Sequence, residues 1–222
     1  MSHIGSYLNQ MLFPPKCALC RSVLEREETD LCRECRATAP EYPQGKLKLQ
    51  FVDSAAAVWY YKDNVRLSLH RYKFRRARHL AEPFGKMLAM KVLSSGMEEV
   101  DLVTWVPISP LRKLFRGYDQ DQLLAEVAAR ELGLPCVPLL KKIRHNRPQS
   151  GIEGYAKRRA NVLGVYRTVN EDRIPGSKIL LVDDIFTTGA TSGECARMLL
   201  EAGAKSVALA VVAGADHTNN SR

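Results

Sequence analysis

The sequence has no apolar run long enough to span a membrane, and its first residues, Met1–Gly5, do not form a basic region followed by an apolar stretch. It also has no internal repeat and no low-complexity tract. With no membrane-spanning run and no evident secretory signal, we expect a cytoplasmic protein that does not insert into a membrane. The 222 residues, 45% of them hydrophobic, suit one medium domain with a small appendage.

Basic residues outnumber acidic ones, which gives a formal net charge of +9. They gather in three segments, Arg66–Arg78, Lys141–Arg147 and Lys157–Arg159. Such clusters are either ordinary solvated surface or a binding face for a polyanion, such as a pyrophosphate group or nucleic acid. The charge alone does not choose between these interpretations.

The cysteines near the N-terminus have the paired spacing C-x2-C-x11-C-x2-C, formed by Cys17, Cys20, Cys32 and Cys35. Two such pairs can deliver four thiolates to one tetrahedral Zn²⁺, and so short a segment has little core of its own without metal. Disulfides would need an oxidising compartment, and a redox site would need only one pair. We therefore predict a structural zinc site, with Cys136 and Cys195 as core thiols.

Alternating strand and helix patterns predict a parallel sheet flanked by helices. A proline-containing linker, Glu41–Gln50, separates this part from the cysteines, so we expect a zinc module at 1–42 and an α/β domain at 43–222. Strands are expected at 54–60, 100–106, 136–140, 162–166, 179–182 and 207–213, and helices around 80–92, at 121–132 and at 192–202.

The segment Ile179–Thr191 carries the strongest chemical signal. Its four apolar residues predict a buried strand that ends at Asp183 and Asp184, followed by a loop of threonines and glycine. Thr191 and Glu194 have the spacing of a capping box, so we expect a helix to start at Thr191. Amide groups at a helix start bind phosphate, and carboxylates accept hydrogen bonds from sugar hydroxyls or lie near Mg²⁺. A phosphorylated ribose would suit both parts of the segment, with its phosphate at the helix start and its hydroxyls at the carboxylates.

The same segment resembles the phosphoribosyl-pyrophosphate (PRPP) binding motif of type I phosphoribosyltransferases. The alternative is a response-regulator receiver domain, which also carries Leu-Val-Asp-Asp. In that domain the acids lie near the start, whereas here only a short stretch follows Asp184, and Thr187–Thr191 has no receiver role.

Further segments resemble the ComF (competence protein F-like) family nearly along the whole chain. They are the four-cysteine module, Val106–Pro110 with Arg112, Arg116–Gln120, and Arg144 through Asn161. Two residues depart from the pattern. Asp119 stands where the family usually has Asn, so a pyrophosphate contact there is in question, and Arg147 stands where Thr is expected.

The resemblance implies a type I phosphoribosyltransferase-like sheet with a small zinc-ribbon-like module. It implies catalytic roles for Asp183 and Asp184 at the ribose hydroxyls, pyrophosphate contacts by Arg112 and Arg116, and Mg²⁺ bound with PRPP. The alternative for Arg112 and Arg116 is that they are ordinary surface arginines. The resemblance also implies that Ile143–Asn161 closes over the site. The 5′-phosphate would contact Thr187, Thr188, Gly189, Ala190 and Thr191.

Two functions follow from this resemblance. The first is a phosphoribosyltransferase in DNA uptake or nucleotide salvage, whose acceptor the sequence does not identify. The second is a non-catalytic module that senses PRPP or a nucleotide and binds single-stranded DNA or DNA-uptake proteins through its zinc module and basic face. Tyr60, Tyr61, Tyr72 and Phe74 lie among the charges and would stack bases, unless they belong to the core.

Overall fold

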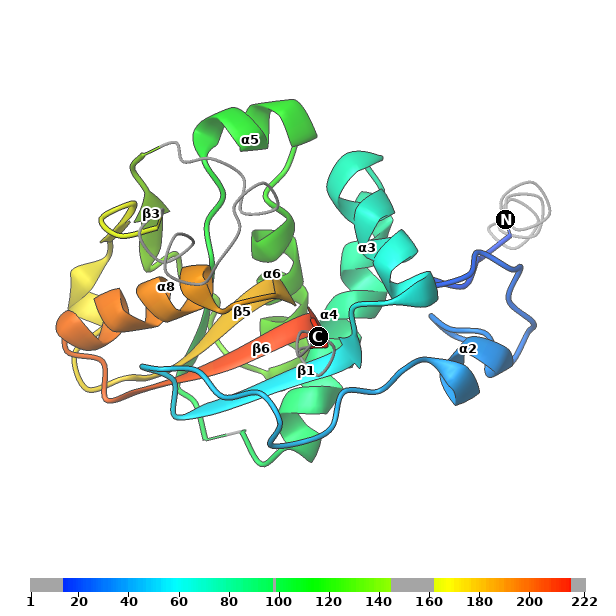
Figure 1. Ribbon diagram of the computed structural model, residues 1–222, viewed down its shortest axis with the longest axis horizontal. Coiled ribbons are helices and arrows are strands. Elements are labelled where there is room, and N and C mark those ends of the chain that lie inside the picture. The colour runs from blue at the N-terminus through cyan, green and yellow to red at the C-terminus, as the bar shows by residue number, and fades with distance from the viewer. Residues whose placement is uncertain (1–13, 98, 145–161, 217–222) are drawn as a thin grey trace, which may run out of the picture.

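A computed structural model describes residues 14–97, 99–144 and 162–216. Its centre is a four-stranded parallel sheet in the order β1-β6-β5-β2 (Figure 1). The parallel sheet with flanking helices confirms the expected fold class. The strands are β1 Ser54–Tyr60, β2 Leu102–Trp105, β5 Lys178–Phe186 and β6 Ser206–Gly214.

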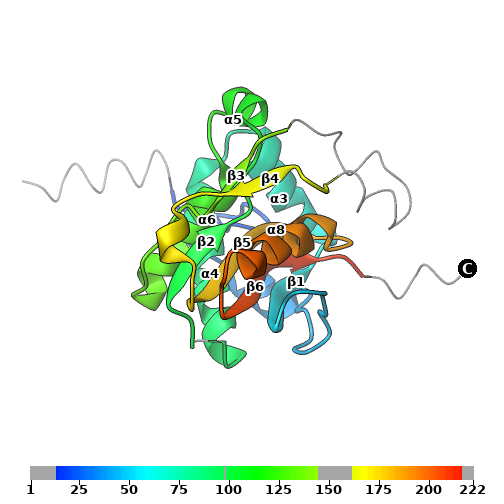
Figure 2. The same cartoon turned by 90° about the vertical axis from the view of Figure 1, so that its left-hand side faces the viewer.

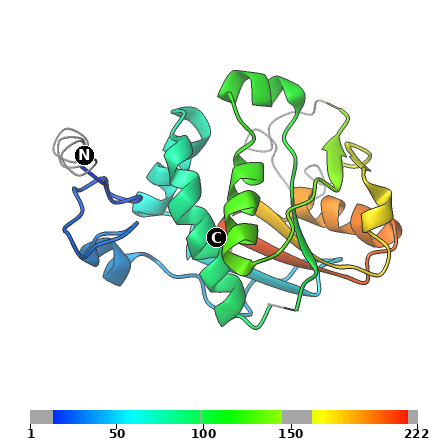
Figure 3. The same ribbon diagram turned by 180° about the vertical axis from the view of Figure 1, so that it is seen from behind.

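Both faces of the sheet are buried, as expected where helices cover a parallel sheet. Alternate residues of β5 point to opposite faces: Leu180 and Val182 pack with the core under α4 and α6, and Leu181 packs with the core under α8. Helix α8 lies over the sheet in Figure 1, and α4 and α6 lie side by side on the other face in Figure 3. These helices are α4 Ala81–Ser94, α6 Gln120–Leu132 and α8 Ala190–Glu201.

A small antiparallel ribbon, β3 Leu140–Lys142 and β4 Tyr166–Thr168, lies above α8 in Figure 2. The sequence placed these strands a few residues earlier, at 136–140 and 162–166. Pro135 and Pro138 have no N–H to donate, so Cys136 forms only an isolated bridge to Val103. The apolar residues that suggested the earlier positions are buried in the core without forming a ladder.

Three helices were not predicted from the sequence. Helix α3 buries Val65, Leu69 and Tyr72 at helical spacing, and α5 is bounded by the cap residues Ser109 and Gly117. Short 3₁₀ turns, η1 Arg78–Leu80 and η3 Glu171–Arg173, precede α4 and β5. The three helices are α2 Arg33–Thr38, α3 Asp63–Phe74 and α5 Pro110–Arg116.

The cysteine module packs directly on α3. The hydroxyl of Ser68 donates a hydrogen bond to the Ala18 carbonyl, and the Arg71 guanidinium donates to the Leu19 carbonyl at 2.6 Å. Buried residues of the module, including Cys17 and Leu19, belong to the same apolar cluster as the core around α4 and α6. The module is therefore part of one continuous core. In the part of the chain that the structure describes, no helix has both the length and the apolar character to cross a membrane.

Candidate functional site

The acidic pair lies at the carboxyl end of the sheet, where parallel α/β folds bind ligands. Strand β5 does not end at Val182, as the sequence suggested, but continues through Asp183 and Asp184 to Phe186 because β6 pairs with it up to Gly214. Strand β2 ends opposite Val182. Beyond that point one edge of β5 is free of strand neighbours, and the two acids lie there.

Helix α8 begins one residue earlier than predicted, and the expected capping box is not formed. Gly189 caps the helix in a left-handed conformation, with φ of 71°, and no side chain caps it. Glu194 instead accepts hydrogen bonds from the Gly164 amide and from Arg197. A Cβ atom at Gly189 would lie 2.5 Å from a Leu49 methyl group, so the loop before α8 is held close to its neighbours.

Sequence reasoning missed three residues that surround the acids. Lys73 of α3 forms an ion pair with Asp184 at 2.9 Å. Gln120 and Asp121, from the start of α6, also lie here, and the Gln120 amide donates to both Asp121 and Asp184 at 3.4 and 3.5 Å. These residues reach the acids only because α3 and α6 pack beside the end of β5 in the folded protein. Helical spacing on α3, from Val65 to Tyr72, was the signal that could have located Lys73.

Charges in this cluster are strongly perturbed. Burial raises the pKa of Asp183 to about 7, and the Asp184 charge adds to the rise. Burial and the charges of Asp184 and Asp183 raise the pKa of Asp121. Burial alone would lower the pKa of Lys73, but the Asp184 carboxylate outweighs it and the pKa is raised. With one ammonium group facing three buried carboxyl groups, these shifts favour the protonated forms of Asp121 and Asp183 as long as no further cation is bound.

These groups open into a cleft of about 800 Å³. Basic side chains also line it, among them Lys142, whose pKa is lowered to about 8 by burial and by the charge of Arg112. Thr188 is not part of the lining, and its buried hydroxyl has no hydrogen-bond partner among the described residues. The predicted site residues in the lining are Arg112, Arg116, Asp183, Asp184, Thr187, Gly189, Ala190 and Thr191.

Asp119, the departure noted in the sequence, faces away from this chemistry. Its carboxylate caps α6 by accepting hydrogen bonds from the amides of Asp121 and Gln122, and it also accepts one from Ile108. It is buried and does not line the cleft. Whether position 119 contacts a pyrophosphate stays an open prediction, and Arg147 and most of Ile143–Asn161 lie outside the described residues.

The basic segment Arg66–Arg78 borders the cleft with part of its length. Lys73, Phe74 and Arg76 line the cleft. Tyr72 is fully buried and unable to stack a base, whereas Phe74 is 59% exposed beneath the Arg116 guanidinium, which lies 5.1 Å from the ring centroid. The segment thus has residues that line the cleft as well as exposed residues outside it, such as Arg66 and Arg75.

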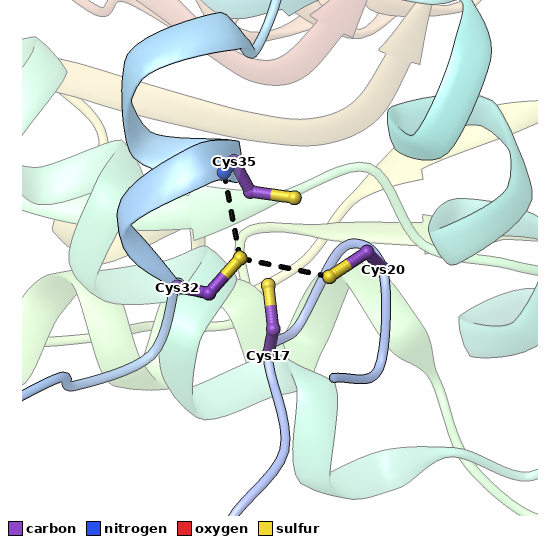
Figure 4. A group of neighbouring side chains, drawn as sticks. All are labelled: Cys17, Cys20, Cys32 and Cys35. Atoms are coloured by element: carbon purple, nitrogen blue, oxygen red, sulfur yellow. Dashed lines mark hydrogen bonds between the residues drawn. The ribbon is translucent and has the colours of Figure 1, made fainter. Parts of the chain in front are cut away.

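The four N-terminal cysteines converge as free thiols (Figure 4). Their sulfur atoms all lie within 4.8 Å of one another, and those of Cys20 and Cys32 are 3.6 Å apart. Ligands about 2.3 Å from a tetrahedral zinc are about 3.8 Å apart, so the donor set fits Zn²⁺. The Cys32 sulfur also accepts a hydrogen bond from the Cys35 amide at 3.4 Å, as is suitable for a metal-bound thiolate.

Comparison with known proteins identifies both parts. Residues 123–221 match the phosphoribosyl transferase domain, and residues 8–46 match the double zinc ribbon domain. These matches confirm a phosphoribosyltransferase-like fold with an N-terminal zinc-ribbon-like module, and they support structural zinc. The boundary between the parts, at residue 42, remains a prediction.

The similarity to curated proteins extends along most of the chain. Competence protein ComFC of Streptococcus pneumoniae is 32% identical over 198 residues, covering 86% of this chain and 84% of that protein. DNA utilization protein YhgH of Salmonella typhimurium is 29% identical over 202 residues, covering 86% of each. Competence protein F of Haemophilus influenzae is 23% identical, covering 86% of this chain and 93% of that protein.

Among solved structures, the glutamine PRPP amidotransferase from B. subtilis is 26% identical, with a TM-score of 0.41 over 61% of this chain and 26% of that chain. Adenine phosphoribosyltransferase from Saccharomyces cerevisiae is 19% identical, with a TM-score of 0.38 over 82% of this chain and 86% of that one. These TM-scores are below the level at which two folds are equated.

Proposed function

The chain belongs to the ComF family, and on that basis we propose that it binds PRPP with Mg²⁺ in the cleft at the end of β5, as a phosphoribosyltransferase-like protein of DNA uptake. One observation carries the proposal: the acids of β5 and the start of α8 line the same cleft as Arg112 and Arg116. Such a cleft offers both acceptors for sugar hydroxyls and donors for phosphate.

The start of α8 would bind the 5′-phosphate. Amides at a helix N-terminus bind anions, and the helix dipole favours negative charge there. Thr187 and Thr191 add hydroxyl groups to the lining, and Gly189 keeps this turn without a Cβ atom. Thr188 would contribute its backbone, since its hydroxyl is buried and the residue is not part of the cleft lining.

The ribose hydroxyls would bind to Asp183 and Asp184. Asp183 already accepts a hydrogen bond from Ser192 at 2.7 Å, which orients its carboxylate. Carboxylate oxygens are also what Mg²⁺ prefers, so the donor set fits that ion. Bound Mg²⁺ would supply charge neutralisation for the pyrophosphate.

Group transfer at this site would depend on positioning and electrostatics. The lone pair of the acceptor would form a bond to ribose C1 while the bond between C1 and the pyrophosphate oxygen breaks. Pyrophosphate would leave with the electron pair of that broken C1–O bond. Arg112 and Arg116 would neutralise the leaving charge, and Lys142 lines the same side of the cleft. The carboxylates would stabilise the positive charge that develops on the ribose.

A second candidate function, binding of single-stranded DNA without turnover, is favoured by the rim of the cleft. Phe74 and Phe115 are 59% and 74% exposed, and Arg76 and Arg116 line the cleft with them. Exposed aromatic rings among arginines stack bases and contact phosphates. The family's DNA-related names fit this use as well.

Calorimetric titration with PRPP tests the proposal. We expect Mg²⁺-dependent binding to the wild-type protein and a loss of at least about tenfold in affinity, or about 1.4 kcal/mol, for Asp183→Ala with Asp184→Ala. Asp119→Asn, a change of one nearby carboxylate that does not line the cleft, is the matched control. Unchanged PRPP affinity in the double variant would contradict the role of the acids. Pyrophosphate release with a panel of bases and nucleosides separates turnover from binding.

A further inference from the structure

Three carboxylates from two distant segments meet beside the cleft. Asp121 begins α6, and Asp183 and Asp184 end β5, yet carboxylate oxygens of all three lie within 4.8 Å of one another. Each residue is at most 8% exposed. Oxygen ligands at about 2.1–2.4 Å from one ion are at most about 4.2–4.8 Å apart. The three groups therefore have the spacing of ligands around a single hard cation.

Two buried oxygens beside this cluster have no partner. Oδ1 of Asp121 and Oε1 of Gln120 are both buried and accept no hydrogen bond among the described residues, although each residue is only 3% exposed. Gln120 is not one of the three acids, and its amide nitrogen already faces Asp121 and Asp184. Leaving buried acceptors unpaired is costly. The unpaired oxygen of Asp121 belongs to the cluster itself and indicates a missing positive partner beside that carboxyl group.

Among the described residues, the three acids form one ion pair, between Lys73 and Asp184. Its ammonium group is 2.9 Å from Asp184 Oδ2 and compensates one of three potential negative charges. Lys142 belongs to the same cleft lining, and among the described residues it forms no ion pair with the acids. A divalent cation would balance the remaining charge.

We propose that Asp121, Asp183 and Asp184 form a preformed site for a hard divalent cation, Mg²⁺ or Mn²⁺, which binds before any sugar phosphate and displaces Lys73 from Asp184. The inference deepens the proposed function because it uses the same acids, and it adds Asp121 as a ligand and Lys73 as the internal cation that the metal replaces. The Gln120 amide would orient Asp121 and Asp184.

Mn²⁺ alone is the probe. Electron paramagnetic resonance follows the loss of the free Mn²⁺ signal as zinc-loaded protein is added at pH 8, without PRPP. We expect one Mn²⁺ per chain, competed by Mg²⁺. Asp121→Asn should weaken binding by at least about tenfold, and Asp119→Asn, the same change two residues away, should leave it unchanged. Lys73→Met should strengthen binding several-fold because the competing ammonium is gone.

Each result separates this inference from the proposed function. Saturable Mn²⁺ binding that depends on Asp121 supports it even if PRPP does not bind. Absence of Mn²⁺ binding, or equal binding by Asp121→Asn, overturns it even if PRPP binds with Mg²⁺. Equal or weaker affinity in Lys73→Met overturns the displacement of Lys73. Circular dichroism and melting curves confirm that the variants are folded, and Asp183→Asn provides a second loss-of-ligand variant.

Discussion

Gly85 lies where helices α4 and α6 make their closest approach. An added Cβ atom would lie 2.4 Å from the Val127 Cβ and 3.2 Å from the Leu124 carbonyl oxygen. We expect Gly85→Ala to destabilise the fold by about 1–3 kcal/mol through overpacking, despite the better helix propensity of alanine. Thermal melting followed by circular dichroism measures this.

The matched control is Gly193→Ala in α8, where the nearest atom to the new Cβ is a Leu49 methyl carbon at 3.4 Å. There the new methyl group meets ordinary packing, and helix propensity favours alanine by about 1 kcal/mol. A melting temperature that falls equally in both variants would mean that the helix contact at Gly85 is not responsible.

Single residues also show what the sequence could predict about the site. Asp183, Asp184 and the threonines were identifiable because they are contiguous and follow a buried strand. Lys73 and Asp121 were not, because they lie far from β5 in the chain and meet it only when α3 and α6 pack against the sheet. A local pattern contains no information about such an approach.

At the scale of elements, we expect the zinc module to depend on its metal as well as on the core that it shares with α3, α4 and α6. Cys32 both belongs to the thiol cluster and caps α2 through its sulfur. We expect Cys32→Ser to lose most of the bound zinc and to lower the melting temperature, since structural zinc contributes folding energy directly. Metal analysis of the purified protein measures the zinc content.

Cys136→Ser provides the comparison, because that thiol is outside the cluster. It should keep one zinc per chain. A Cys32→Ser protein with full zinc content would show that the four thiols do not share one ion.

The elements with a clear hydrophobic period were predicted best. Strand β1 matches the expected residues 54–60, and α6 and β6 differ from expectation by one residue at some ends. Their hydrophobic periods are clear because each buries a full face. Helices α3 and α5 were missed because basic residues obscure the apolar spacing of α3, and α5 buries no residue at all. In α5 only its caps mark the helix.

At the scale of the whole molecule, the net charge of +9 predicts weak, sequence-independent binding to single-stranded DNA. Arg66 and Arg75 are exposed on or beside α3 and do not line the cleft. We expect Arg66→Ala with Arg75→Ala to weaken DNA binding. The slope of log affinity against log salt concentration should become shallower by up to about two, which corresponds to about two lost phosphate contacts. PRPP affinity should be preserved. Fluorescence anisotropy of a labelled oligonucleotide across a salt series measures both quantities.

Arg173→Ala with Lys205→Ala removes the same charge beyond the opposite, amino end of the sheet. DNA affinity that falls equally in the two double variants would indicate a general charge effect and no localised binding face. An affinity that does not change with salt would contradict phosphate contacts altogether.

Helix α3 touches two distant parts of the molecule. Arg71 donates to the carbonyl of Leu19 between the first two cysteines, and two residues later Lys73 pairs with Asp184. If α3 moves as one body, zinc and sugar phosphate become linked ligands, and linkage is reciprocal: whatever factor zinc adds to PRPP affinity, PRPP must add to zinc affinity. Competition with a fluorescent zinc chelator, with and without PRPP, measures that factor. Equal zinc affinities would show that α3 transmits nothing, whereas tighter zinc in the presence of PRPP would make the zinc module an allosteric partner of the cleft.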